Sequence, residues 1–131
     1  NDYCNRNNLR WYQVGALLKN GYTPSIESWL AGFDKAKYVI TDSFHGSVFS
    51  IIFNKPFVSI GNDVRGMSRF NSLLGVFNLE DRLVSEKDEL ITIPPPNWEA
   101  VNAILSEWQK KSINFLETNL SSYDFSNCPR I

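Results

Sequence analysis

His45 is the only histidine among the 131 residues of this chain, and it lies in the polar segment Asp42-Ser43-Phe44-His45-Gly46. A neutral imidazole can accept a proton near pH 7 and release it again once it is protonated, so one well-placed histidine is enough for acid–base chemistry. Asp42 could orient the ring or bind a sugar hydroxyl, and Gly46 could let a ligand approach the backbone closely. The alternative is a histidine that only hydrogen-bonds a loop, with Asp42 and Ser43 as helix caps.

Arg65 and Arg69 form a second candidate group, because a helix over residues 66 to 77 would bring two arginines four positions apart to one face. Guanidinium groups match carboxylate and phosphate oxygens in a two-pronged way. Arginines near a helix N-terminus oppose the helix dipole, which favours a bound anion nearby. The alternative is a surface pair bridged to Asp63 or Glu80.

Other kinds of site find little support in the sequence. One histidine and two distant cysteines, Cys4 and Cys128, cannot assemble a zinc site, and no calcium-loop spacing, phosphate loop or dinucleotide fingerprint is present. Thirteen basic and fourteen acidic residues give a net charge of −1, so we expect no nucleic-acid partner. We expect both cysteines to be free thiols of a reducing cytosol.

The elements around His45 are predicted from a run of β-branched and aromatic residues at 38 to 41, an apolar segment at 44 to 53 and a second short run at 57 to 60. These segments form a strand, a helix and a strand, and the helix is apolar on nearly every side, which predicts deep burial. Parallel strands of such a unit end at the same edge of the sheet, where ligands of open α/β sheets bind. Residues 42 to 45 and 61 to 69 should therefore share that edge.

The rest of the chain supplies further helices. Thr23 and Pro24 predict a helix start before residue 26, residues 79 to 84 predict a short strand or turn, and Asn97 predicts the cap of a long helix. That helix should pack across the domain or onto a missing one through a mostly apolar stripe: Val101, Ile104, Leu105, Trp108, Ser112, Phe115, Leu116 and Asn119. We predict one Rossmann-like α/β domain over residues 1 to 120, with a parallel sheet and flanking helices, and a tail over residues 121 to 131.

The run YVITDSFHGSVFSIIFNKPF at residues 38 to 57 strongly resembles the polysaccharide pyruvyl transferase family, and the segments at 65 to 70 and 80 to 83 are also similar to its members. The resemblance spans about residues 22 to 85. It implies a two-domain fold like that of GT-B glycosyltransferases, with the active site between the domains. The chain then corresponds to the C-terminal domain, and its partner is the N-terminal domain of the same protein. We expect the C-terminal domain to be inactive alone.

The resemblance also implies an activity. Family members use phosphoenolpyruvate, without a metal or another cofactor, to build a pyruvate ketal on a sugar of capsule, exopolysaccharide or cell-wall polymers. The acceptor would be a glycan or a lipid-linked sugar, in the cytoplasm or at the inner face of the membrane. The family's histidine corresponds to His45, and Asp42, Ser43, Gly46, Arg65 and Arg69 are the expected substrate-binding residues. Some relatives have Arg-Leu-His-Gly where this chain has Ser43-Phe44-His45-Gly46, so position 43 lacks their cation.

Two other functions remain open from the sequence. A glycosyltransferase of similar fold would bind the diphosphate of a nucleotide sugar at the same helix N-terminus. A non-catalytic binding module would keep its function after His45→Ala. Binding of a nucleoside diphosphate separates the first alternative from the pyruvyl transferase, and the effect of the substitution separates the second.

Overall fold

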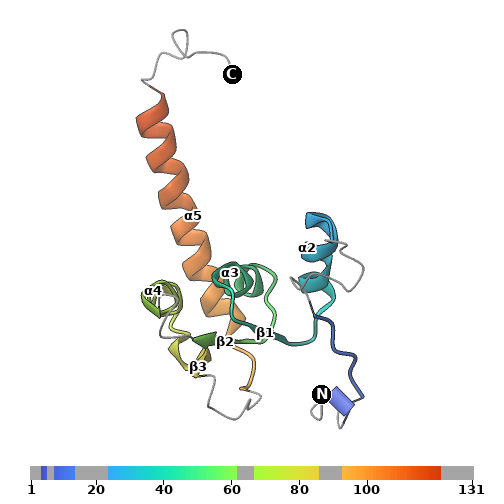
Figure 1. The fold of residues 1–131 in the computed structure, drawn as a ribbon. Coiled ribbons are helices and arrows are strands. Elements are labelled where there is room, and N and C mark those ends of the chain that lie inside the picture. Colours follow the sequence, from blue (N-terminus) through green and yellow to red (C-terminus); the bar gives the residue numbers. More distant parts are fainter. Residues whose placement is uncertain (1–3, 6–7, 14–23, 62–66, 86–92, 122–131) are drawn as a thin grey trace.

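A computed structural model describes residues 4–5, 8–13, 24–61, 67–85 and 93–121 (Figure 1). Its centre is a three-stranded parallel sheet in the order β1 (Val39–Thr41), β2 (Phe57–Gly61), β3 (Leu83–Ser85). Val39 pairs with Phe57 at one side of β2, and Ser59 pairs with Leu83 at the other. This confirms the predicted α/β class with a parallel sheet and flanking helices.

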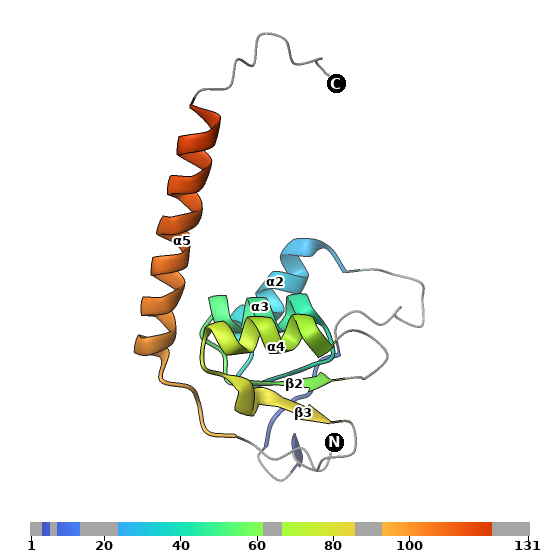
Figure 2. The same cartoon turned by 90° about the vertical axis from the view of Figure 1, so that its left-hand side faces the viewer.

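Two helices, α3 (Phe44–Ile52) and α4 (Met67–Val76), lie side by side on one face of the sheet (Figure 2). They connect β1 to β2 and β2 towards β3, so each parallel pair of strands is joined by a helix. Between these helices, the sheet and the start of the last helix lies one core of buried apolar side chains: Ile51, Phe57, Leu74, Phe77, Leu79 and Val101.

Helix α2 (Ile26–Lys35) begins at a different cap from the one that the sequence predicts. Ser25 is the N-cap, and its Oγ accepts a hydrogen bond from the Ser28 amide at 3.2 Å. Pro24 therefore precedes the cap instead of occupying the first helical position, and Thr23 lies outside the described residues. Serine satisfies the orphan amides at least as well as threonine, which explains the shift of two residues. Trp29 packs edge-on against Phe49 at 4.9 Å and so joins α2 to α3.

Helix α3 is less enclosed than its apolar composition predicts. Its buried residues are the small Gly46, Ser47 and Ser50, together with Ile51. His45 and Ile52 are exposed. The helix covers one face of a narrow sheet, so only the side facing the strands is fully enclosed. The prediction of burial on nearly every side is therefore wrong.

The sequence predicts a short strand or a turn over residues 79 to 84, and the segment after α4 contains both. Asn78 takes a left-handed backbone conformation with φ of 54° just after the helix ends. A short 3-10 helix, η1 (Glu80–Arg82), follows, and β3 comes directly after it. Asparagine tolerates this conformation better than most residues, and it ends the helix sharply here.

The long helix α5 (Trp98–Leu120) is capped as predicted, because Asn97 Oδ1 accepts a hydrogen bond from the Ala100 amide at 3.2 Å. Val101 is buried in the core, with Trp98, Ile104 and Leu105 packed against it. Beyond these first turns the helix projects away from the sheet (Figures 1 and 2), and the stripe continues into exposed residues: Trp108, Phe115 and Leu116. The helix packs across the domain only through its first turns.

The remaining predictions about the chain ends are tested only in part. Cys4 is a free thiol, whereas Cys128 and the predicted tail beyond Ser121 lie outside the described residues. The domain limits at residues 1 to 120, and the assignment to one half of a two-domain enzyme, stay predictions. Among the described residues, no helix combines the length and the apolar character that crossing a bilayer requires.

Candidate functional site

The candidate site lies where β1 ends and α3 begins. Thr41, the last residue of β1, pairs in parallel with Ser59 of β2, so both strands run towards the same edge of the sheet. Asp42, Ser43 and His45 follow at this edge and are exposed. The structure thus gives the sequence-predicted residues of this segment the strand-end position typical of ligand sites in open α/β sheets.

Ser43 is the N-cap of α3. Its Oγ accepts a hydrogen bond from the Gly46 amide at 3.4 Å, and its own amide donates to Thr41 Oγ1 at 3.1 Å. Helical hydrogen bonding leaves the amides of Phe44 and His45 without intrahelical acceptors. These amides and the positive end of the helix dipole favour an anion beside His45.

Gly46 has a packing role that the sequence did not predict. A Cβ atom on this residue would overlap the Thr41 side chain, so the missing side chain lets α3 lie directly on the end of β1. Gly46 is buried on that side. Its predicted role, a close approach of ligand to the backbone, remains a prediction.

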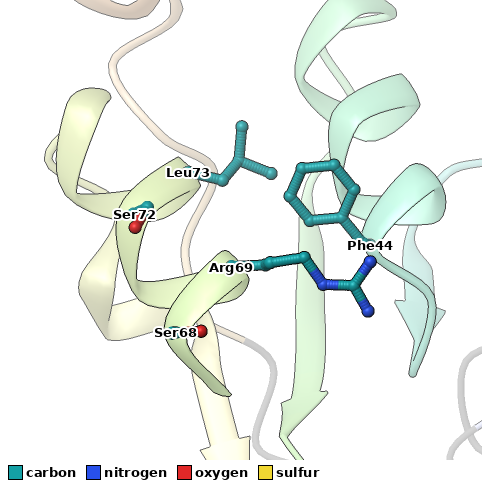
Figure 3. Close-up of a pocket in the computed structure, with 5 residues that line it drawn as sticks. All are labelled: Phe44, Ser68, Arg69, Ser72 and Leu73. Atoms are coloured by element: carbon teal, nitrogen blue, oxygen red, sulfur yellow. The ribbon is translucent and has the colours of Figure 1, made fainter. Parts of the chain in front are cut away.

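Arg69 extends from α4 towards the first turn of α3 (Figure 3). Its Cζ lies 5.7 Å from the centroid of the Phe44 ring, in cation–π contact. The two residues line an open pocket of about 370 Å³ together with Ser68, Ser72 and Leu73. The second predicted arginine, Arg65, lies outside the described residues, so the expected pair on one helix face is untested.

Phe44 is the site residue that sequence reasoning missed. Its ring contacts His45 edge-on at 5.8 Å and Phe70 at 6.2 Å, in addition to Arg69. One side chain thereby joins the candidate proton carrier on α3 to the candidate anion-binding group on α4. The available signal was an aromatic residue directly before the only histidine, but it gives no information about the contact with α4.

The arrangement combines an exposed imidazole, two amides without an intrahelical acceptor and a guanidinium at one sheet edge. Such a set can bind an anionic group and move a proton beside it. In the parts of the chain that the structure describes, no three histidine, cysteine or carboxylate side chains are grouped so that they could hold a metal ion. The expectation of chemistry without a metal or cofactor is not tested by this.

Comparison with known families bears on the same segment. Residues 2–64 match the sequence model of the family described as polysaccharide pyruvyl transferase. The match confirms the resemblance of the run at residues 38 to 57 and supports a transferase enzyme of polysaccharide biosynthesis, whereas the similar segments at 65 to 70 and 80 to 83 lie beyond it. The matched range includes Asp42, Ser43, His45 and Gly46, while Arg69 lies beyond it. No match was found among curated proteins or among solved structures.

Proposed function

We propose, from the match to polysaccharide pyruvyl transferases as premise, that this protein transfers the pyruvyl group of phosphoenolpyruvate to a pair of sugar hydroxyls in a bacterial surface polysaccharide. One observation carries the proposal. The only histidine of the chain is exposed at the first turn of α3, at the edge of the sheet where β1 ends and within the matched range. His45 is the proposed proton carrier.

The chemistry requires one proton to move to carbon while phosphate leaves. Protonation of the methylene carbon of phosphoenolpyruvate turns it into a methyl group and makes the neighbouring carbon electrophilic. Two sugar hydroxyl oxygens form bonds to that carbon, and its bond to the phosphate oxygen breaks. Of the two hydroxyl protons, one replaces the proton given to carbon and the other leaves with phosphate. His45 can give the first proton and recover it from a hydroxyl.

The donor carries a carboxylate and a phosphate, so the site needs positive charge that is already in place. The free amides at the start of α3 and the Arg69 guanidinium support this role, and Arg65 is the further candidate. Ser43 stands where some relatives have arginine, so the charge at this point comes from the helix terminus and from α4. Asp42 is proposed to orient His45 or a sugar hydroxyl.

The wider setting is part of the same proposal. A GT-B-like arrangement would place the acceptor, a glycan or a lipid-linked sugar, in a cleft between this domain and an N-terminal domain of the same protein. The exopolysaccharide, capsule or cell-wall polymer would then be modified in the cytoplasm, or at the inner face of the membrane, before export.

The test is phosphate release from phosphoenolpyruvate by the intact protein over a panel of acceptor glycans, with His45→Gln as the variant. Lys110→Gln, at an exposed position of α5, is the control substitution. We expect acceptor-dependent release by the wild type and the control, and a loss of at least about 100-fold in His45→Gln. No release with any acceptor, together with binding of a nucleoside diphosphate, would favour the glycosyltransferase. Unchanged function of the protein after His45→Gln would favour a binding module.

A further inference from the structure

We infer that Phe44 is a positioning residue that holds the Arg69 guanidinium at the start of α3, where the donor's negative charge is to be bound. The inference rests on the proposed function and adds a residue to its donor site. It concerns a contact between two helices, since Phe44 opens α3 and Arg69 lies in the first turn of α4.

Arg69 depends on this ring for its orientation. The residue is exposed, and within the described part of the chain it makes no salt bridge. A free arginine side chain of this kind samples many rotamers, and ordering it on ligand binding costs entropy. The ring of Phe44, 5.7 Å from Cζ, reduces this cost by holding the guanidinium in place beforehand.

The Phe44 ring is itself held from behind. Phe70, only 5% exposed, contacts it edge-on with ring centroids 6.2 Å apart. Leu73 points towards the same ring from the next turn of α4 (Figure 3). A ring held between the buried Phe70 and the half-buried Leu73 moves less than an exposed ring would, so it can hold the arginine in place.

A guanidinium placed over a ring keeps its N–H groups available. The N–H donors of a guanidinium lie in its plane and point outward, and no carboxylate among the described residues pairs with those of Arg69. These donors match a carboxylate or phosphate in a two-pronged way. The contact with Phe44 is therefore proposed to hold Arg69 while leaving N–H donors for the substrate.

The experiment is a double-mutant cycle on the intact protein, with KM for phosphoenolpyruvate and kcat measured separately. Phe44→Leu removes the ring, Phe44→Tyr keeps it, Arg69→Ala removes the cation, and Phe44→Leu/Arg69→Ala removes both. Phe49→Leu is the matched control, because Phe49 is another half-buried ring of α3 but packs against Trp29 and Phe33 of α2.

We expect Phe44→Leu to raise KM for the donor about two- to five-fold with little change in kcat, in line with the strength of an exposed cation–π contact. Phe44→Tyr should restore the wild-type value, and Phe44→Leu should add nothing once Arg69 is alanine. An equal rise in the Arg69→Ala background, or the same rise in Phe49→Leu, would overturn the inference. A wild type without acceptor-dependent phosphate release would overturn the proposed function itself, and with it this inference.

Discussion

Gly46 packs so closely on Thr41 that a Cβ atom at position 46 would overlap Thr41 Oγ1 and lie 2.9 Å from Thr41 Cβ. Thr41 also accepts the hydrogen bond of the Ser43 amide. The last residue of β1 thus fixes both the N-cap and the first turn of the helix that carries His45. The position of the candidate catalytic residue is therefore set by a strand-to-helix contact that permits no side chain at residue 46.

Gly46→Ala is expected to destabilise the fold by about 1–3 kcal/mol, because an overpacked contact must be relieved by moving the helix or the strand. The measurement is the free energy of unfolding from a denaturant titration. Gly75→Ala is the matched control in α4, where a Cβ would meet only Glu80 Oε1 at 3.6 Å. It should stabilise by up to about 1 kcal/mol, as alanine does in a helix interior. Equal effects of the two substitutions would contradict the packing argument.

The buried hydroxyls of Ser47 and Ser59 are expected to contribute unequally to the free energy of unfolding. Either hydroxyl could donate in the 2.7 Å contact between Ser47 and Ser59, and the 3.3 Å bond from Ser47 Oγ to the Ser43 carbonyl favours Ser59 as the donor. Ser47→Ala leaves the buried Ser59 hydroxyl without that acceptor and should cost about 1–3 kcal/mol of unfolding free energy. Ser59→Ala should cost less, because Ser47 keeps its bond to Ser43. A larger loss in Ser59→Ala would show that the donor assignment is wrong.

Capping and anion binding can be separated at Ser43. Asp and Asn cap helices as well as Ser does, so Ser43→Asp and Ser43→Asn should both keep the stability of the wild type. Only the aspartate places a negative charge beside the proposed donor site. Two like charges about 4 Å apart repel by about 1 kcal/mol even in water, which predicts a rise of about five-fold in KM for phosphoenolpyruvate. Steady-state kinetics of the pair check this, and equal KM values in both variants would argue against an anion at this helix terminus.

The charged side chain of Arg82 is buried, and few interactions offset its loss of hydration. Its side chain is 5% exposed, Nε lies 3.3 Å from Asp81 Oδ1, and Nη1 has no hydrogen-bond partner among the residues described. The contact to Asp81 brings opposite charges together without hydrogen-bond geometry. Arg82→Met should therefore leave the unfolding free energy within about 1 kcal/mol of the wild type, or raise it, because a buried charge is replaced by an apolar chain of similar length. A loss above about 2 kcal/mol in chemical denaturation would show that the guanidinium is better satisfied than this.

Local patterns predicted those parts of the fold that local interactions determine. The β-branched run before Asp42-Ser43 predicted β1 and the capped start of α3, and Asn97 predicted the cap of α5. The exposed half of α5 could not be predicted in the same way. Its mostly apolar stripe continues from Val101 to Phe115, and nothing in the periodicity indicates where the packing partner ends.

The sequence also could not predict the contacts between elements that are distant along the chain. Arg69 was selected for its charge, but its contact with Phe44 depends on how α3 and α4 lie against each other on the sheet. Gly46 was interpreted as an approach for ligand, because the closeness of Thr41 is visible only once the strand and helix are placed. Residue type identified the candidate chemistry, and tertiary packing determines how those groups are held.

The most direct test of the central claim follows the pyruvyl carbons themselves. The intact protein is incubated with phosphoenolpyruvate labelled with ¹³C at its three carbons and with an acceptor glycan, and the glycan is examined by NMR. We expect a labelled ketal carbon, carboxylate and methyl group on the glycan with the wild type, and none with His45→Gln. Label that remains in free phosphoenolpyruvate or pyruvate with every acceptor, or an equal yield from His45→Gln, would contradict this expectation.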